Sequence, residues 1–192
     1  MLEPMTVKLP LQPDVLASLR AGQQVLLSGS VFTARDVAHA RLAERLAQTP
    51  GHLPFGLAGQ ALLYAGPTPP SPGRPAGSIG PTTASRMDEF TPGLFAAGIT
   101  AAIGKGPRSP GVRDACAKFG AVYFAAVGGA AALLGTKVVS ATPVAYEDLG
   151  TEAIVRLELV DFPAVVAIDS LGGDLYASAV ADWATEVGEV SS

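Results

Sequence analysis

Four positively charged side chains lie where a strand-like segment leads into a helix or a glycine-rich turn: Arg35, Arg86, Lys105 and Arg108. Functional groups of open α/β sheets collect at such junctions, because helix N-termini present free backbone N–H groups and a positive dipole end. Arginine binds a carboxylate through two hydrogen bonds, whereas lysine acts as a point charge. Several such groups on one rim would suit a small substrate with two carboxylates. Spacing alone does not show that they converge, since a lone arginine near a helix start is usually a surface residue.

The elements that would position these side chains alternate between strands and helices through the middle of the chain, and the end is richer in strands. Hydrophobic patterning predicts strands at 23–32, 61–64, 99–103, 121–127, 137–145, 154–160 and 164–169. It predicts helices at 34–47, 82–95 and 109–119, a short helix after Gly128-Gly129, and a terminal helix from Ala177. This order indicates an α/β fold with a mixed sheet flanked by helices.

Two helix starts carry residues that favour capping. Thr33 is a candidate N-cap for the helix at 34–47, and Asp36 lies three residues on, where an acidic side chain can reach back in a capping box. Thr82 or Thr83 can cap the helix that we expect to run to Phe95.

Residues 66–80 are dense in proline and glycine. Both flanks have the patterning of ordered elements, so a rigid surface loop is preferred over a linker between domains. Beyond the loop, Met87, Phe90 and Leu94 recur at helical spacing, which indicates a stripe that faces the core.

Composition excludes several classes of protein. Apolar residues make up 48% of the 192 residues and charged residues 16%, which is typical of a globular protein of one domain. The net charge of −4 argues against a general nucleic-acid binder. The N-terminus lacks the pattern of a signal peptide, and the most apolar stretch, 121–135, is too short to span a bilayer. We therefore expect a cytoplasmic protein with no membrane or nucleic-acid partner.

Five stretches of sequence, in the same order and at similar spacing, resemble the class I fumarase and L-tartrate dehydratase family. The signature is GPTTASRMD at 80–88. The others are SGSVFTARDVAHARL at 28–42, YAGPTPPSPG at 64–73, IGKGPRS at 103–109 and AAVGGAAAL at 125–133, and YEDLGTEAIVRLELVDF at 146–162 extends the match. Together they cover roughly 22–176, which we take as the core of a single domain over residues 1–192.

The resemblance implies the smaller part of a two-part enzyme. In the family, a larger part supplies three cysteines to a [4Fe-4S] cluster, and a smaller swivelling β/β/α domain closes over the substrate; some members split the two into α and β subunits. This chain resembles the β subunit. A cluster needs at least three thiolates, and Cys116 is the single cysteine, so we expect it to be a buried, inert thiol. The cluster would belong to a larger α subunit, without which this chain would be inactive, in a hetero-oligomer.

The resemblance also implies roles for four residues. Arg35 and Arg86 would each bind a substrate carboxylate, and Lys105 would add a third cation. Thr82, on the same helical side as Arg86, would be the base that handles the C3 proton of malate, and Thr83 is its rival. A threonine hydroxyl is a poor base, so its pKa must be lowered by cations or its proton must pass to a carboxylate on the other subunit.

Other roles stay open at this point. His39 is either a structural histidine or a substrate contact, Arg108 is a surface or interface residue outside the proposed set, and Asp36 is a cap or a group that orients Arg35. Asp88 and its neighbouring blocks look more like the fumarase branch than the tartrate branch. The expected function is the β subunit of an iron–sulfur fumarate hydratase. The alternatives are the β subunit of L-tartrate dehydratase or of a dehydratase for a related hydroxy-diacid, and a non-catalytic dicarboxylate-binding or structural subunit.

Overall fold

A mixed sheet of seven strands forms the centre of the protein, as seen in a computed structural model that describes residues 3–190. The strands are β1 (Met5–Leu9), β2 (Gln24–Thr33), β3 (Ala61–Leu63), β4 (Ala101–Gly104), β5 (Val122–Ala125), β6 (Val138–Ala145) and β7 (Ile154–Ile168). The helices are α1 (Pro13–Ser18), α2 (Asp36–Gln48), α3 (Thr91–Ala96), α4 (Pro110–Phe119), α5 (Ala131–Gly135) and α6 (Leu175–Val190), with 3-10 turns η1 (Ala84–Met87) and η2 (Glu147–Glu152). The predicted α/β class with a mixed sheet is confirmed.

The long strand β7 connects the two ends of the parallel part of the sheet. Strands β2, β3, β4 and β5 run parallel to one another, and β7 pairs antiparallel with both β2 and β5. Strand β6 adds antiparallel to β7, and β1 adds parallel to β2. The carboxyl ends of β2, β3 and β4 therefore lie along one edge.

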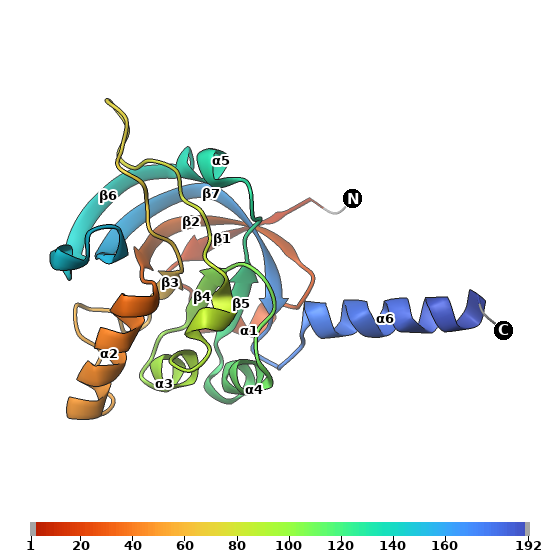
Figure 1. The fold of residues 1–192 in the computed structure, drawn as a ribbon. Coiled ribbons are helices and arrows are strands. Elements are labelled where there is room, and N and C mark those ends of the chain that lie inside the picture. The colour runs from red at the N-terminus through yellow and green to blue at the C-terminus, as the bar shows by residue number, and fades with distance from the viewer. Residues whose placement is uncertain (1–2, 191–192) are drawn as a thin grey trace.

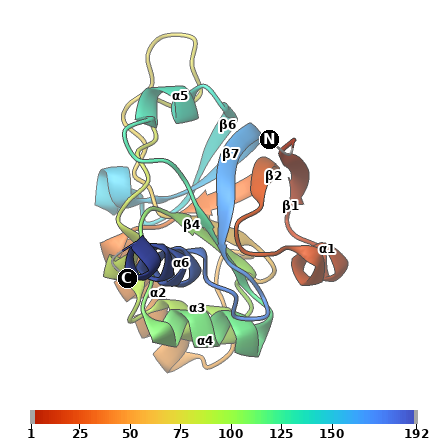
Figure 2. The ribbon, with the colours of Figure 1, turned by 90° about the vertical axis from the view of Figure 1, so that its right-hand side faces the viewer.

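Helices and strands cover opposite faces of the parallel strands (Figure 1). Helices α2, α3 and α4 lie on one side, while β6, β7 and α5 lie on the other (Figures 1 and 2). Each side encloses its own buried cluster of apolar residues, with Leu62 and Met87 in the one against the helices and Leu63 and Phe162 in the one under β7. This arrangement matches the β/β/α layering that the resemblance implies.

One predicted gap between strands is absent. Residues 154–160 and 164–169 were expected to be separate strands, but β7 continues through Pro163. Asp161 adopts a φ of 50°, and its backbone N–H donates to the hydroxyl of Ser28 at 2.9 Å. The proline therefore does not end the strand. The pairing of β7 with β2 is locally irregular instead, and its register shifts between Leu27 and Gly29.

The predicted helix at 82–95 is wrong. The 3-10 turn η1 is followed by α3, a separate helix with Pro92 in its first turn, where proline is tolerated. The predicted core stripe is confirmed, because Met87 and Leu94 are buried and Phe90 packs against the same cluster.

The predicted capping of α2 by Thr33 is also wrong. Thr33 is the last residue of β2, and its hydroxyl donates to the carbonyl of Ala153 and accepts the N–H of Val155. Arg35 occupies the N-cap position without a side-chain hydrogen bond. Instead, Glu152 accepts the N–H of Val37 at 3.0 Å, so the turn between β6 and β7 satisfies the helix start.

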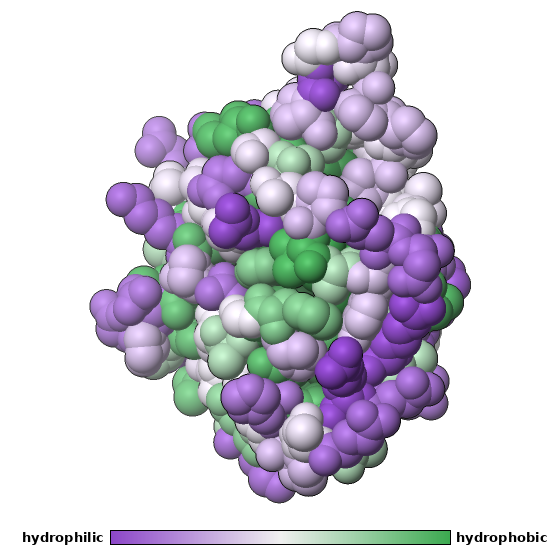
Figure 3. All heavy atoms as spheres, turned by 90° about the vertical axis from the view of Figure 1, so that its left-hand side faces the viewer, coloured by the Kyte–Doolittle hydropathy of each residue, from purple (hydrophilic) through white to green (hydrophobic). Residues whose placement is uncertain are grey.

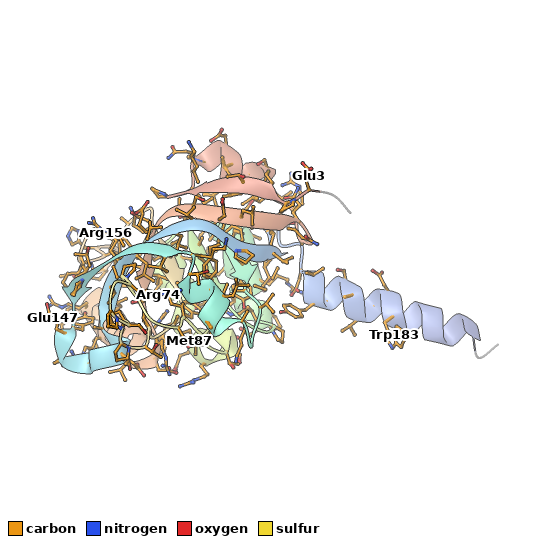
Figure 4. The ribbon with its side chains drawn as sticks, turned by 90° about the horizontal axis from the view of Figure 1, so that it is seen from above. Glu3, Arg74, Met87, Glu147, Arg156 and Trp183 are labelled. Carbon is orange, nitrogen blue, oxygen red and sulfur yellow. The ribbon has the colours of Figure 1, made fainter. Side chains whose placement is uncertain are left out.

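Three short elements were not predicted by the patterning. Strand β1 and helix α1 precede β2, and η2 lies between β6 and β7. The predicted terminal helix from Ala177 is confirmed as α6, which begins at Leu175. It leaves the body of the molecule, and its Trp183 is exposed (Figures 1 and 4). Within residues 3–190, no helix combines the length and apolar character needed to cross a bilayer. The predicted single domain over 1–192 extends past the described residues at both ends and stays a prediction.

The proline-rich segment at 66–80 forms an extended loop that rises beyond the sheet (Figure 1). Backbone hydrogen bonds join Thr68 to Ser78 and to Gly77 across its base, and Ser71 accepts the N–H of Arg74 near its tip. The hydrogen bonds agree with the predicted ordered surface loop.

His39 is fully buried between α2 and the sheet. Its Nδ1 lies 2.9 Å from the carbonyl oxygen of Arg35, which can only accept, so Nδ1 carries the hydrogen. Its ring meets that of Tyr64 edge-on at 4.9 Å between centroids. Burial, reinforced by the nearby charge of Arg108, lowers the pKa of His39 from 6.5 to about 4, so the imidazole is neutral at pH 7.

This burial predicts an acid-sensitive fold. Between pH 6.5 and about 4 the unfolded chain binds a proton at His39 that the folded chain does not. The free energy of unfolding therefore decreases as the pH is lowered through this range, by up to about 3 kcal/mol. We expect His39→Gln to lose this part of the slope in denaturant titrations at a series of pH values. His52→Gln, at an exposed histidine, is the matched control. Equal slopes in wild type and His39→Gln would contradict the assignment.

Candidate functional site

The four residues singled out by the resemblance all follow the carboxyl ends of neighbouring parallel strands. Arg35 comes two residues after β2, and Lys105 directly follows β4. Thr82 lies beside the end of β3, where its N–H donates to the carbonyl of Tyr64 at 2.6 Å. Arg86 lies in η1, four residues further on. The sheet topology thus brings them to one edge.

Thr82 and Lys105 are brought together by backbone pairing. Lys105 donates its N–H to the carbonyl of Thr82 at 3.1 Å, and Ala84 donates its N–H to the carbonyl of Lys105 at 2.9 Å. Gly104 makes this approach possible, because a Cβ there would lie 2.9 Å from the Cβ of Ala84 and 3.0 Å from the ring of Tyr64. Gly104 thus allows a close backbone approach beside Lys105.

Arg35 and Arg86 are brought together by Asp36. Arg86 donates its Nε–H to Oδ1 of Asp36 at 2.8 Å, and Nε of Arg35 lies 3.8 Å from Oδ2 of the same carboxylate. Thr82 precedes η1 and is not on a helix with Arg86, so the predicted shared helical side is wrong. Thr82 and Arg86 are near each other only because they are four residues apart in the sequence.

A second carboxylate lies on the other side of Arg35. Oε1 of Glu152 is 3.8 Å from Nη2 of Arg35, and its Oε2 accepts the N–H of Val37. Gly66 leaves room for this arginine, because a Cβ at that position would lie 3.1 Å from Nη1 of Arg35 and 2.6 Å from the carbonyl of Thr151. Figure 3 shows the face that carries α2 and the turn between β6 and β7, where hydrophilic side chains surround a smaller apolar area.

The polar groups at this edge keep much of their hydrogen-bonding capacity. Within residues 3–190, the Lys105 ammonium has no ion pair, the Thr82 hydroxyl has no hydrogen bond, and no hydrogen bond reaches the Arg35 guanidinium. Arg86 uses only Nε. Neither Thr82 nor Thr83 caps η1 with its side chain, so the capping role predicted for them is wrong. The edge can therefore offer many donors to an anionic ligand.

Arg108 was expected at the surface or at an interface, but it lies beneath this edge of the sheet. Its side chain is fully buried, and Nε donates to Oδ1 of Asp88 at 2.6 Å. Nη2 donates to the hydroxyl of Thr91, and the guanidinium carbon lies 5.4 Å and 4.8 Å from the ring centroids of Tyr64 and Tyr123. This group holds the segment with Thr82 against the segment with Lys105.

Sequence reasoning missed three members of this arrangement. Glu152 contacts both Arg35 and the start of α2, Asp88 accepts the N–H of Ser109 as well as Arg108, and Tyr123 donates to the carbonyl of Gly106 at 2.9 Å. Glu152 and Asp88 lie inside the recognised blocks of sequence. Their partners, however, are distant along the chain, so only the fold reveals the contacts.

The chain does not fit an iron–sulfur cluster. Among the described residues, no group of three or more His, Cys, Asp or Glu side chains is placed to hold a metal ion. Cys116 is buried in α4, and burial raises the pKa of its thiol to about 12, which confirms the predicted inert cysteine.

Comparison with known proteins gives the site a context. The family described as Fumarase C-terminus matches residues 3–179. Fumarate hydratase 2 of Leishmania major is 38% identical over 169 residues, which are 86% of this chain and 29% of that protein. The aerobic class I fumarate hydratase of Escherichia coli (strain K12) is 39% identical over 168 residues, 85% of this chain and 30% of that protein.

A second kind of relative has a similar length to this chain. The L(+)-tartrate dehydratase subunit beta of Escherichia coli (strain K12) is 33% identical over 173 residues, 88% of this chain and 84% of that subunit. By contrast, the chain spans less than a third of the fumarate hydratases it matches. Because the family match covers nearly all of the described residues, this chain belongs to the fumarase C-terminus family, and its homologues include class I fumarate hydratases and the β subunit of L(+)-tartrate dehydratase.

Proposed function

We propose that this chain is the β subunit of an iron–sulfur-dependent fumarate hydratase, which catalyses the reversible hydration of fumarate to malate. The observation that carries the proposal is the set of cationic side chains, Arg35, Arg86 and Lys105, whose hydrogen-bond donors are largely unused at one edge of the sheet. The fumarate hydratase homologues support the choice of substrate.

The cations would bind a diacid and stabilise its reaction. Arg35 and Arg86 would each take a carboxylate, and Lys105 would add a point charge. Removal of the C3 proton of malate places negative charge on the adjacent carboxylate. Fixed cations stabilise that charge more than the ground state, which is the condition for a faster reaction.

Thr82 would accept the C3 proton. Its hydroxyl has no hydrogen bond among residues 3–190, and its carbonyl accepts the backbone N–H of Lys105, so the residue is fixed at the end of β4 while its side chain makes no structural hydrogen bond. A threonine hydroxyl is a weak base, so its own proton would have to pass to a carboxylate of a partner.

The partner would be a larger α subunit with three cluster cysteines, in a hetero-oligomer. Cys116 cannot replace them, since at least three thiolates are required. When bound in the partner, a [4Fe-4S] cluster supplies Lewis-acid activation of the hydroxyl group. The similar length of the tartrate dehydratase β subunit supports a separate subunit, and it also keeps L-tartrate as the second candidate substrate.

Replacement of Thr82 tests the base. With the larger subunit co-expressed, we expect Thr82→Ala to lower kcat by at least about 100-fold with malate binding unchanged, because general base catalysis contributes about 10²–10⁴-fold. Thr83→Ala is the matched comparison and should have a small effect. Near wild-type turnover in Thr82→Ala, or a large loss in Thr83→Ala instead, would reverse the assignment.

Steady-state assays of the reconstituted pair test the substrate. We expect kcat/KM for malate to exceed that for L-tartrate by about tenfold or more, since one well-placed group contributes about that much to discrimination. A preference for L-tartrate would show that the chain is instead the β subunit of an L-tartrate dehydratase. Binding of malate to the pair without turnover of either diacid would favour the non-catalytic alternative.

A further inference from the structure

We infer that Asp36 is a positioning residue that sets the two substrate arginines in place through their Nε atoms. The inference rests on the proposed function and adds a residue to it. Asp36 is the first residue of α2 and directly follows Arg35, while Arg86 is brought to it from η1, 50 positions along the chain.

The geometry assigns one carboxylate oxygen to each arginine. Oδ1 accepts the Nε–H of Arg86 at 2.8 Å. Oδ2 lies 3.8 Å from Nε of Arg35, and both of these atoms are buried without a hydrogen-bond partner. Two buried groups that face each other with no other partner need only a small shift to form a hydrogen bond, and catalytic contacts often tighten in this way when a ligand binds.

Contact at Nε leaves the outer part of the Arg86 guanidinium free. The two Nη groups can then meet a carboxylate end-on through parallel hydrogen bonds. The Arg86 side chain is 51% exposed, so without Asp36 it would have to be ordered when substrate binds. Ordering a long side chain weakens binding by about three- to tenfold.

Two other roles for Asp36 have to be separated from this one. An acidic residue in the first turn stabilises a helix through its dipole, and this role affects folding alone. A negative charge near the site would also weaken attraction for a dianion, so its loss through charge alone would tighten substrate binding. Positioning predicts the opposite sign and depends on the hydrogen-bond acceptor.

The test compares Asp36→Ala with Asp36→Asn in the reconstituted pair. We expect Asp36→Ala to lower kcat/KM for malate by about tenfold and Asp36→Asn to lower it by only about threefold. The asparagine oxygen can still accept from Nε of Arg86, whereas its NH2 group, a donor, would replace the acceptor that faces Nε of Arg35. In an Arg86→Ala background, Asp36→Ala should cost much less than in wild type, since the two act as a unit.

Asp148→Ala is the matched control. Asp148 also binds α2, through two hydrogen bonds to Arg41, but contacts neither substrate arginine. It should leave kcat/KM unchanged. Equal losses in Asp148→Ala and Asp36→Ala, tighter malate binding in both Asp36 variants, or full activity of Asp36→Ala would each overturn the inference.

A measurement on the isolated chain keeps the inference testable without activity. By NMR, the Nε–H of Arg86 should exchange slowly with water in wild type, Asp36→Asn and Asp148→Ala, and fast in Asp36→Ala. If the wild-type pair hydrates no diacid, the proposed function fails, while this exchange rate still decides the role of Asp36. Fast exchange in the wild type would overturn it.

Discussion

The close approach of residues 82–84 to the end of β4 determines the rest of the site. Two backbone hydrogen bonds join this segment to Lys105, and they form because Gly104 presents no side chain toward Ala84 and Tyr64. A side chain at Gly104 would push the segment away and would separate Thr82 from Lys105. Arg86 would move with them, because it follows in η1. A single missing Cβ therefore places a hydroxyl and two cations relative to one another.

The contact is supported from below by charge that is fully removed from solvent. Arg108 is buried, and a buried ion pair is tolerated only when hydrogen bonds satisfy both partners. Asp88 meets this condition with two acceptor contacts. Arg108 donates through Nε and Nη2 and packs against two tyrosine rings, while its Nη1 is buried without a hydrogen-bond partner. Because its geometry is specific, this pair fixes the alignment of the segments above it more strictly than apolar packing would.

The difference between local patterns and tertiary contacts explains which features could be predicted from the sequence. Local patterns were sufficient for most strands, for the buried stripe of Met87 and Leu94 and for the burial of Cys116, because these depend on periodicity and hydrophobicity. The candidate site residues came from the resemblance. The errors occurred where tertiary contacts override local preference: Thr33 bonds across to Ala153, and residues 82–84 pair with Lys105 in place of continuing a helix.

Polar contacts between residues far apart in the sequence could not be predicted, for a further reason. No buried partner was predicted for Asp88, Arg108 or Glu152, since charged residues are almost never fully buried unless they are paired. Their partners lie 20 or 115 positions away, and no local period encodes such a pairing. Only the closure of the sheet by β7 brings the turn with Glu152 to the start of α2.

Arg35 and Arg86 differ from Arg41 and Arg108 in how many of their hydrogen-bond donors the fold uses. Arg108 has two hydrogen bonds in the core, and Arg41 has two to Asp148 at the surface. Arg35 has none, although Nε is buried, and Arg86 has one. Leaving a buried guanidinium atom unsatisfied costs free energy, about 1–3 kcal/mol for a neutral group and more for a charged one. Nη1 of Arg108 is also buried without a partner, so this cost alone does not mark a binding site. At Arg35 the facing Oδ2 of Asp36 lacks a partner as well, and a small approach of the two side chains would remove the cost at both atoms.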